Sequence, residues 1–254
     1  MIFDADTHMS PYRNFDLSIN AEELVELLSG AGVDKALCWL MPLGVTDVSE
    51  SNRYLYDSAK KHDLLVPFGW ANVREGLQKA LRDAKQCLSE FGFAGVKLNG
   101  AQNEYPIDSP EAMAVCECIA GLGGIIAFHI GSDAPDFTSA RRAGAVADRF
   151  PETPIIMVHM GGAGVGTADF ADDLIAAALA HPNMILTGSA IAIDRVEKAI
   201  DILGPDRVMY GSDAPFSSVT KCLGEYRTML EKHDENTRNL VMGGNAQRLF
   251  GYAG

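Results

Sequence analysis

The chain has 254 residues, of which 47% are hydrophobic and 22% are charged, a composition typical of a folded globular protein. Its 34 acidic and 21 basic residues give a net charge of −13, which argues against nucleic acid and anionic membranes as partners. No apolar run approaches the ~20 residues of a transmembrane helix. No basic segment followed by an apolar one opens the chain, so we expect a cytoplasmic protein.

The five cysteines are odd in number and mostly lie within apolar runs. This pattern predicts free thiols rather than a disulfide framework. Cys116 and Cys118 are two residues apart in an expected helix, so they point to different sides of it. That geometry is poor for a metal site, and we expect both to be small core residues.

Strand-like and helix-like segments alternate along the chain. The expected strands cover residues 3–10, 35–41, 64–73, 94–99, 125–130, 155–160, 184–187 and 207–210. The expected helices cover residues 20–29, 49–62, 77–91, 109–122, 139–150, 169–180 and 195–203, and two C-terminal helices follow near 221–232 and 237–249. The run KALCWLM at 35–41 is typical of a strand buried on both faces. Pro67 and Gly69 predict a bend within the third strand.

Strict alternation implies a parallel sheet with right-handed crossovers. Eight strand–helix pairs in a chain of about 250 residues favour a closed (β/α)8 TIM barrel over an open sheet, as one domain over residues 1–254. No G-x-G-x-x-G follows the first strand, which weakens the dinucleotide-binding alternative. The glycine-rich run 161–166 follows the sixth strand and is expected to be a flexible loop at the site.

Polar residues end several of the expected strands, and in such a barrel the active site lies at those C-terminal ends. Three of the six histidines are among them. One histidine in an apolar strand is better explained as a core residue, but several converging with an aspartate indicate a metal site. The residues at the strand ends are Asp6, His8, Lys97, Asn99, His129, His159 and Asp213.

The opening stretch from Phe3 to Ser10 has the same character. In an extended strand Asp4, Asp6 and His8 lie on one face, because side chains alternate with a period of two. Polar groups on a face that would normally be buried need a partner, most simply a metal ion.

An ordered set of motifs then resembles the amidohydrolase superfamily. It is closest to the branch that contains small metal-dependent hydrolases and non-oxidative decarboxylases such as the aminocarboxymuconate semialdehyde type. The motifs span nearly the whole chain in the family's order: Asp6-x-His8, GVKL at 95–98, FHIG at 128–131, IIMVHMGG at 155–162, YGSDAP at 210–215 and NAQRLF at 245–250.

The resemblance implies one divalent metal, usually zinc, held by His8, His129 and Asp213, with His159 close to the metal-bound water or the substrate. The family's usual opening is His-x-His, and here the second histidine is replaced by Ser10, a poor zinc ligand. Some decarboxylases of this branch open with an acid-x-His in which the acid is a ligand. We therefore expect Asp6 to complete the set with His8, His129 and Asp213.

The resemblance gives Lys97 two interpretations. In some branches this lysine is carboxylated and bridges two metals, whereas in the branch resembled here an ammonium that contacts an anionic substrate is favoured. Arg141 is a further candidate for binding substrate, as are Arg142 and Arg13. For each arginine alone, a solvated surface charge is the better expectation.

The predicted function is that of a metal-dependent hydrolase of a small ester, lactone or amide. Asp213 would move the proton of the metal-activated water, and His159 would stabilise the oxyanion. The first alternative is a metal-dependent non-oxidative decarboxylase, which the carboxylate-first opening favours, whereas the short chain favours hydrolysis. The second alternative is a metal-free lactonase or a silent binding protein. The expected partners are a small substrate, which could be anionic, and a second copy in a homodimer.

Overall fold

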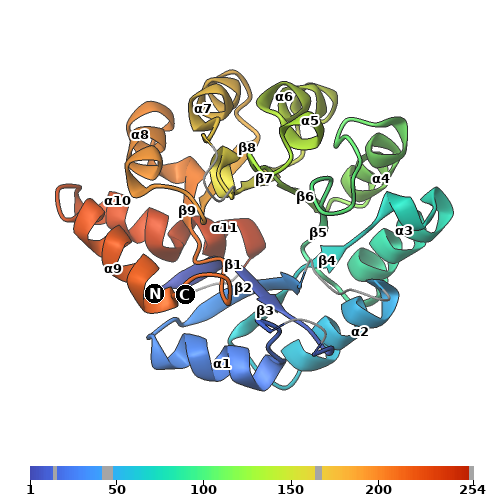
Figure 1. The fold of residues 1–254 in the computed structure, drawn as a ribbon, viewed down its shortest axis with the longest axis horizontal. Coiled ribbons are helices and arrows are strands. Elements are labelled where there is room, and N and C mark those ends of the chain that lie inside the picture. The colour runs from blue at the N-terminus through green and yellow to red at the C-terminus, as the bar shows by residue number, and fades with distance from the viewer. Residues whose placement is uncertain (14–15, 42–47, 164–167, 252–254) are drawn as a thin grey trace.

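Parallel strands curve around a common axis, and the connecting helices cover the outside of the curved sheet (Figure 1). The computed structural model describes residues 1–13, 16–41, 48–163 and 168–251. The strands are β1 Phe3–Met9, β2 Lys35–Leu40, β3 Leu65–Pro67, β4 Gly69–Trp70, β5 Gly95–Leu98, β6 Ile125–His129, β7 Ile155–Val158, β8 Met184–Gly188 and β9 Val208–Tyr210. The helices are α1 Ala21–Gly30, α2 Val48–Ala59, α3 Leu77–Lys85, α4 Pro110–Gly121, α5 Pro135–Thr138, α6 Ala140–Arg149, α7 Ala171–Ala180, α8 Ile193–Leu203, α9 Val219–Leu230, α10 Glu235–Asn239 and α11 Asn245–Phe250.

The sheet closes into a barrel between its first and last strands. One part has the order β1-β2-β3 and the other runs from β4 to β9. Phe68 separates β3 from β4, so these two short strands occupy one barrel position with the bend that Pro67 and Gly69 predicted. His8 N donates to Ala214 O at 2.7 Å and Asp213 N donates to Asp6 O at 2.9 Å, which closes the ring. The alternation of the sequence therefore predicted the (β/α)8 barrel correctly.

The strands consist of apolar runs because both of their faces are covered, one by the barrel interior and one by helices. All seven residues of β1 are buried. The helix that follows begins with a capping box, in which the Asn20 side chain accepts from Glu23 N while the Glu23 side chain accepts from Asn20 N. The burial of every residue of β1 places this strand inside the molecule, and the capping box marks where α1 begins.

The structure also differs from the predicted elements in three places. The predicted strand 155–160 ends at Val158, because His159 begins a 3-10 turn in which Met160 has a φ of 53°. The predicted helix 77–91 continues beyond α3 as a π turn, Gln86–Glu90. The four-residue α5 has no counterpart in the predicted elements, since so short a helix has no clear periodicity.

Part of the glycine-rich run, residues 164–166, lies outside the described residues, so its role as a site loop stays a prediction. The part that is described turns sharply. Gly161 has a φ of 88°, and a Cβ there would lie 2.9 Å from the Phe170 ring and 3.0 Å from its backbone. Glycine is therefore required at the last position of the turn.

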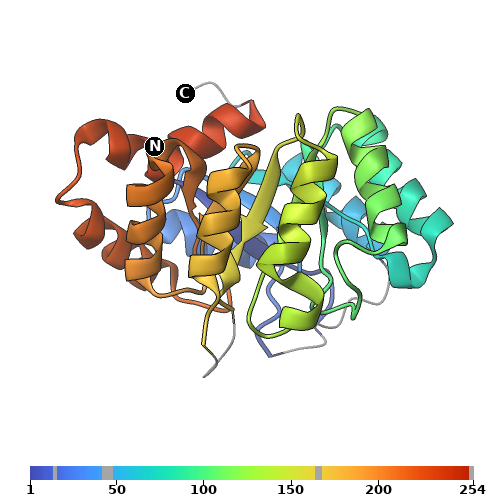
Figure 2. The same cartoon turned by 90° about the horizontal axis from the view of Figure 1, so that it is seen from above.

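The N-terminus of β1 and the C-terminal helix α11 lie at the same end of the barrel (Figure 2). A Cβ at Gly243, between α10 and α11, would lie 2.8 Å from Met1 O, so the two ends of the chain pack closely there. No helix within the described ranges has the length and apolarity needed to cross a bilayer.

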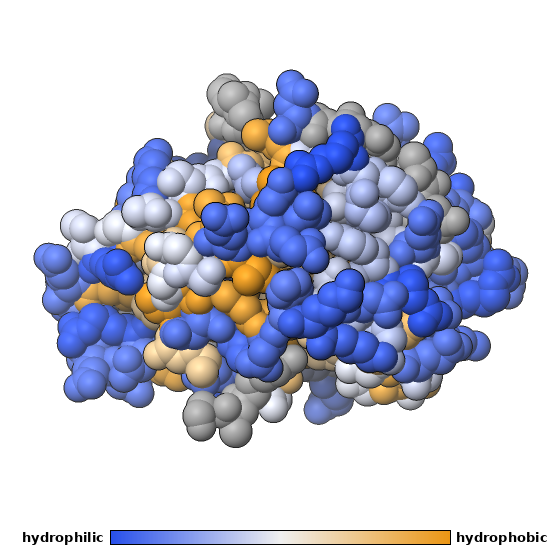
Figure 3. All heavy atoms as spheres, turned by 90° about the horizontal axis from the view of Figure 1, so that it is seen from below, coloured by the Kyte–Doolittle hydropathy of each residue, from blue (hydrophilic) through white to orange (hydrophobic). Residues whose placement is uncertain are grey.

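Most of the face in Figure 3 is hydrophilic, with one hydrophobic area in its left half. Six large apolar side chains are exposed in the described part of the chain: Met1, Leu17, Leu27, Leu122, Leu179 and Ile202. Isolated apolar residues of this kind are normal on a protein surface.

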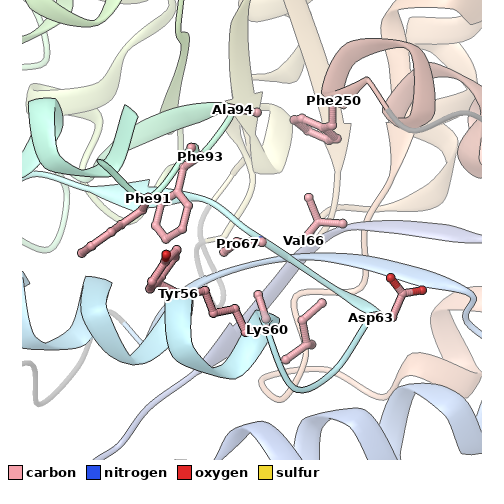
Figure 4. Close-up of a pocket in the computed structure, with 12 residues that line it drawn as sticks. Tyr56, Lys60, Asp63, Val66, Pro67, Phe91, Phe93, Ala94 and Phe250 are labelled. Carbon is pink, nitrogen blue, oxygen red and sulfur yellow. The ribbon is translucent and has the colours of Figure 1, made fainter. Parts of the chain in front are cut away.

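An aromatic crevice of about 280 Å³ lies beside the starts of β3 and β5 (Figure 4). Tyr56 stacks on Phe91 with ring centroids 4.6 Å apart, and Phe93 packs 5.5 Å from Phe91. The ammonium of Lys60 lies 3.9 Å from the Tyr56 ring. In a TIM barrel this N-terminal side serves stability, whereas the functional site lies at the C-terminal ends of the strands.

Candidate functional site

The residues that the sequence placed at strand ends gather at the C-terminal end of the barrel. β1 contributes two of them, β5 and β6 one each, and the turns after β7 and β9 one each. Every one is buried, with at most 9% of its surface exposed. These residues are Asp6, His8, Lys97, His129, His159 and Asp213.

Four of these side chains form one compact cluster. Asp6, His159 and Asp213 each offer a ligand atom, and these atoms lie within 4.8 Å of one another. His8 Nε2 lies 3.5 Å from Asp6 Oδ1 and 3.3 Å from Asp213 Oδ1. Ligands about 2.1 Å from a shared ion are separated from each other by about 3 to 3.5 Å. Asp6, His159 and Asp213 are therefore placed to hold one divalent ion, with His8 beside both carboxylates, and the expected ligand set with His8 and His129 stays a prediction.

A backbone carbonyl fixes the orientation of the His8 ring. Its Nδ1 lies 2.6 Å from Leu40 O, so Nδ1–H donates to this carbonyl and Nε2 faces the two carboxylates. A hydrogen bond of this kind is usual for a metal-binding histidine. Burial would lower the pKa of His8, but the hydrogen bonds to Asp213 and Asp6 raise it above the ordinary value. A bound metal would take the place of that proton.

Asp6 is held by donors on both of its oxygens. Trp39 Nε1 donates to Oδ1 at 2.9 Å, and Ser189 Oγ donates to Oδ2 at 2.5 Å. Burial alone would raise the pKa of Asp6, but the electrostatic interaction with His159, the hydrogen bond from His8 and the charge of Lys97 lower it below its ordinary value. Asp6 is therefore an ionised carboxylate with a fixed orientation.

His129 lies at the edge of this cluster. Its ring is edge-on to His159, with centroids 4.7 Å apart, and its Nε2 lies 2.9 Å from Asp133 Oδ1. Asp133 in turn accepts from Gln102 Nε2 at 3.3 Å. The structure thus places His129 beside the cluster, paired with a carboxylate that the sequence reasoning missed. Its role as a metal ligand stays a prediction.

Lys97 lies deep in the barrel against two indole rings. Its Nζ is 3.7 Å from the Trp39 centroid and 5.5 Å from the Trp70 centroid, and it has no hydrogen-bond partner in the described part of the chain. Burial lowers the pKa of Lys97 to about 8, although Asp6 and Asp213 act in the opposite direction. The N–H groups of this ammonium can therefore donate hydrogen bonds to an oxygen of an anionic substrate.

The backbone is strained where it presents the site. His159 and Asp213 have φ values of 72° and 60°, and Ala190, after β8, has a φ of 48°. Non-glycine residues in this left-handed region are uncommon and cluster at functional sites. The chain thus has a left-handed residue just after each of the strands β7, β8 and β9.

Other expected residues lie apart from the cluster. Arg141 is exposed on α6 and lines a groove of about 780 Å³ between α6 and α7, together with Phe170 and His181. Arg142 is paired with Asp108. The proposed role of Arg141 in substrate binding stays a prediction. The groove that it lines contains none of the histidines of the cluster, His8, His129 and His159.

The first strand also departs from simple alternation. Its pairing with β2 shifts register between Asp4 and Thr7. Asp4 accepts from Ser212 N at 2.9 Å, and burial raises its pKa to about 7. Asp4 therefore joins β1 to the segment after β9, whereas Asp6 and His8 make the cluster.

Several solved structures share this fold over the full chain. The 2,6-dihydroxybenzoate decarboxylase from Rhizobium has a TM-score of 0.78 and 17% identity, with 100% of this chain and 99% of that chain covered. The 5-carboxyvanillate decarboxylase from Sphingomonas paucimobilis has a TM-score of 0.77 and 17% identity, with 99% of each chain covered. The dihydroxybenzoic acid decarboxylase from Polaromonas sp. JS666 has a TM-score of 0.72 and 18% identity, with coverage of 98% and 96%.

Sequence identities this low show a shared fold, whereas the match of the sequence itself shows the family. Residues 45–252 match the amidohydrolase family, Amidohydro_2, which is well over half of the chain. The resemblance that the motifs indicated is thereby confirmed, and the chain belongs to the amidohydrolase family.

Proposed function

We propose that the chain is a metal-dependent, non-oxidative decarboxylase of a small aromatic carboxylic acid. The observation that carries the proposal is Asp6, a buried and oriented carboxylate beside His8 and Asp213 at the C-terminal end of the barrel. The three similar structures named above are decarboxylases of aromatic acids. This evidence supports the decarboxylase alternative better than the hydrolase that the short chain favoured.

The proposed ligands of the metal are Asp6, His8, His129 and Asp213. Two carboxylates and imidazole nitrogens suit zinc and manganese alike. The Polaromonas decarboxylase was solved with bound manganese and the inhibitor 2-nitroresorcinol. We therefore propose a divalent ion and leave the choice between manganese and the zinc expected from sequence to measurement.

When bound, the ion would act as a Lewis acid toward the oxygens of the substrate. Lys97 supplies a buried positive charge for the anionic substrate, since its ammonium has unused donors. His159 or Asp213 delivers a proton to the carbon that bears the carboxylate. The bond between that carbon and the carboxyl carbon then breaks, its electron pair stays with the ring carbon, and CO2 leaves.

The test uses protein purified without chelator, then loaded with manganese or zinc. Its bound metal is measured by elemental analysis, and CO2 release is followed with a panel of hydroxybenzoic acids. A parallel panel of esters, lactones and amides measures hydrolysis. We expect about one equivalent of metal and CO2 release that a chelator abolishes. Hydrolysis without CO2 release would contradict the proposal, and less than about a tenth of an equivalent of metal would contradict the ligand set.

A further inference from the structure

Ser189 lies between two of the site's functional groups. It follows β8 directly and is buried. Its Oγ lies 2.5 Å from Asp6 Oδ2 and 3.0 Å from His159 Nδ1. The hydroxyl thus joins the first strand of the barrel to the turn after the seventh strand.

The directions of these hydrogen bonds follow from counting protons. An ionised carboxylate can only accept, so Ser189 must donate its one proton to Asp6. Toward His159 the hydroxyl can then only accept, so the proton of this bond must be on His159 Nδ1. In the neutral imidazole the other nitrogen, Nε2, therefore carries the lone pair.

The close approach of these groups depends on Gly211. A Cβ at Gly211 would lie 3.0 Å from the Cβ of Asp6, 3.2 Å from that of Ser189 and 2.7 Å from Thr187 Cγ2. A glycine at this position leaves β1 and the end of β8 close enough for the hydroxyl to reach the carboxylate. The hydrogen bond between Ser189 and Asp6 therefore depends on the close packing of Gly211, which follows β9.

We propose that Ser189 is a positioning residue that links Asp6 to His159 and fixes the neutral His159 ring with its proton on Nδ1. Nε2 is then the atom of His159 that takes up a proton from water and passes it to the substrate carbon. This last step rests on the decarboxylase proposed above, whereas the position of the proton on His159 does not.

The consequence for the reaction is that the same carboxylate orients two groups. Asp6 faces His8 through Oδ1 and acts on His159 through Ser189 and Oδ2. A proton taken up by Nε2 leaves a positively charged ring whose Nδ1–H still points toward Asp6, which stabilises that charge.

Nuclear magnetic resonance of protein labelled with ¹⁵N-histidine tests this assignment. Two-bond ¹H–¹⁵N correlations distinguish the two neutral forms of each ring, and His159→Gln identifies the signals of His159. Spectra are recorded for the metal-free protein and for the protein loaded with zinc, which is diamagnetic. We expect His159 to be protonated on Nδ1, although free histidine in water favours Nε2–H.

Ser189→Ala removes the acceptor, so the His159 signals should move toward the Nε2–H pattern. Turnover of any carboxylic acid that the wild-type protein decarboxylates should fall about 10- to 100-fold, as is usual when a residue hydrogen-bonded to a metal ligand is removed. Thr187→Val is the matched control, because Thr187 lies two residues earlier in β8 and its buried Oγ1 has no partner among the described residues.

Thr187→Val should leave the His159 signals and the turnover unchanged. A wild-type ring protonated on Nε2, or on both nitrogens at neutral pH, overturns the proposal, as does an identical spectrum in Ser189→Ala. A protein that decarboxylates no acid but shows the Nδ1–H pattern would refute the proposed function and leave the assignment of Ser189 intact.

Discussion

This chain lacks the second histidine of the family's opening, and Asp6, two residues before His8, is the proposed substitute ligand. Ser10, which takes that histidine's place, accepts from Tyr12 N at 3.0 Å and donates its own N–H to Ile19 O, so it belongs to the loop after β1. Asp6 is oriented toward His8 instead. The two residues therefore have separable roles.

We predict that Asp6→Ala abolishes metal binding and that Ser10→Ala leaves it nearly intact. The reason is that a carboxylate ligates divalent ions well, whereas a serine hydroxyl is a poor ligand. Titration calorimetry with manganese and zinc measures both affinities. Asp6→Asn serves as the control for shape, since the amide keeps the volume and loses the charge. Equal losses in Asp6→Ala and Ser10→Ala would show that Asp6 is not a ligand.

The burial of Lys97 leads us to predict how the free energy of unfolding depends on pH. Its pKa is about 8 in the folded protein and is ordinary, 10.5, when unfolded, so between these values the unfolded chain binds more protons. The contribution of Lys97 to the free energy of unfolding therefore rises as the pH increases from about 8 to 10.5. Below about pH 8 the buried lysine is charged, and this charge destabilises the folded protein. Lys97→Met removes the dependence.

We expect the metal-free Lys97→Met variant to exceed wild type in free energy of unfolding at about pH 7. This advantage should shrink by about 3 kcal/mol by about pH 11. Urea unfolding at several pH values measures it, and the exposed Lys221→Met is the control that should show no such trend. A difference that is constant with pH would mean that Lys97 is not held charged in a desolvated site.

Residues at strand ends could be found from the sequence, because alternation and barrel topology bring those ends together. His8, His129, His159 and Asp213 were found in this way. Trp39 and Ser189 were not, because their contacts with Asp6 join positions 33 and 183 residues apart and depend on how the barrel closes. No local pattern marks an indole or a hydroxyl as the partner of a particular carboxylate.

Among the elements, β5 carries Lys97 and packs closely on β6. A Cβ at Gly95 would lie 2.2 Å from Ile125 O and 2.4 Å from the Phe68 ring. The backbone oxygen cannot move without breaking the ladder that joins β5 to β6. Glycine here is therefore what allows the fourth and fifth barrel positions to meet.

We predict that Gly95→Ala destabilises the protein by about 3 kcal/mol or more, because overpacking against backbone has no easy relief. Gly121→Ala is the matched control at the end of α4. Nothing lies within 4 Å of its added Cβ, and alanine should stabilise the helix by about 0.5 to 1 kcal/mol. Thermal unfolding measures both. A mild effect of Gly95→Ala would show that β5 and β6 can separate without loss.

The order of elements was readable from periodicity, but their ends were not. The strand at 155–160 was expected to continue through His159, since every other residue of IIMVHM is apolar. The chain instead turns into the left-handed region at His159 and Met160. Propensity cannot signal such a turn, because the surrounding barrel imposes it.

For the whole molecule, the cysteines give a direct test. All five are free and none is bonded to another. Burial raises the pKa of Cys38, Cys87 and Cys116, so these thiols are inert in the folded state. We predict that a thiol reagent titrates five groups only after denaturation and that a reductant leaves the unfolding midpoint unchanged. A midpoint that falls in reductant would reveal a disulfide.

The molecular surface leaves the expected homodimer as a prediction. The hydrophobic area in Figure 3 is bordered by hydrophilic residues, and the net charge of −13 disfavours non-specific association. Light scattering compared with the 27.3 kDa of one chain settles the state in solution.

The seam between Asp6 and Asp213 also has a consequence for the order of assembly. β1 is synthesised before β2 to β9, yet its partner on one side is the segment 213–214, more than 200 residues later in the sequence. Until that segment is made, β1 has an unpaired edge and the barrel cannot close. The proposed ligands Asp6 and Asp213 come together only after this late pairing, so a newly made chain would bind its ion last, and the ion would then stabilise the contact between β1 and the segment after β9.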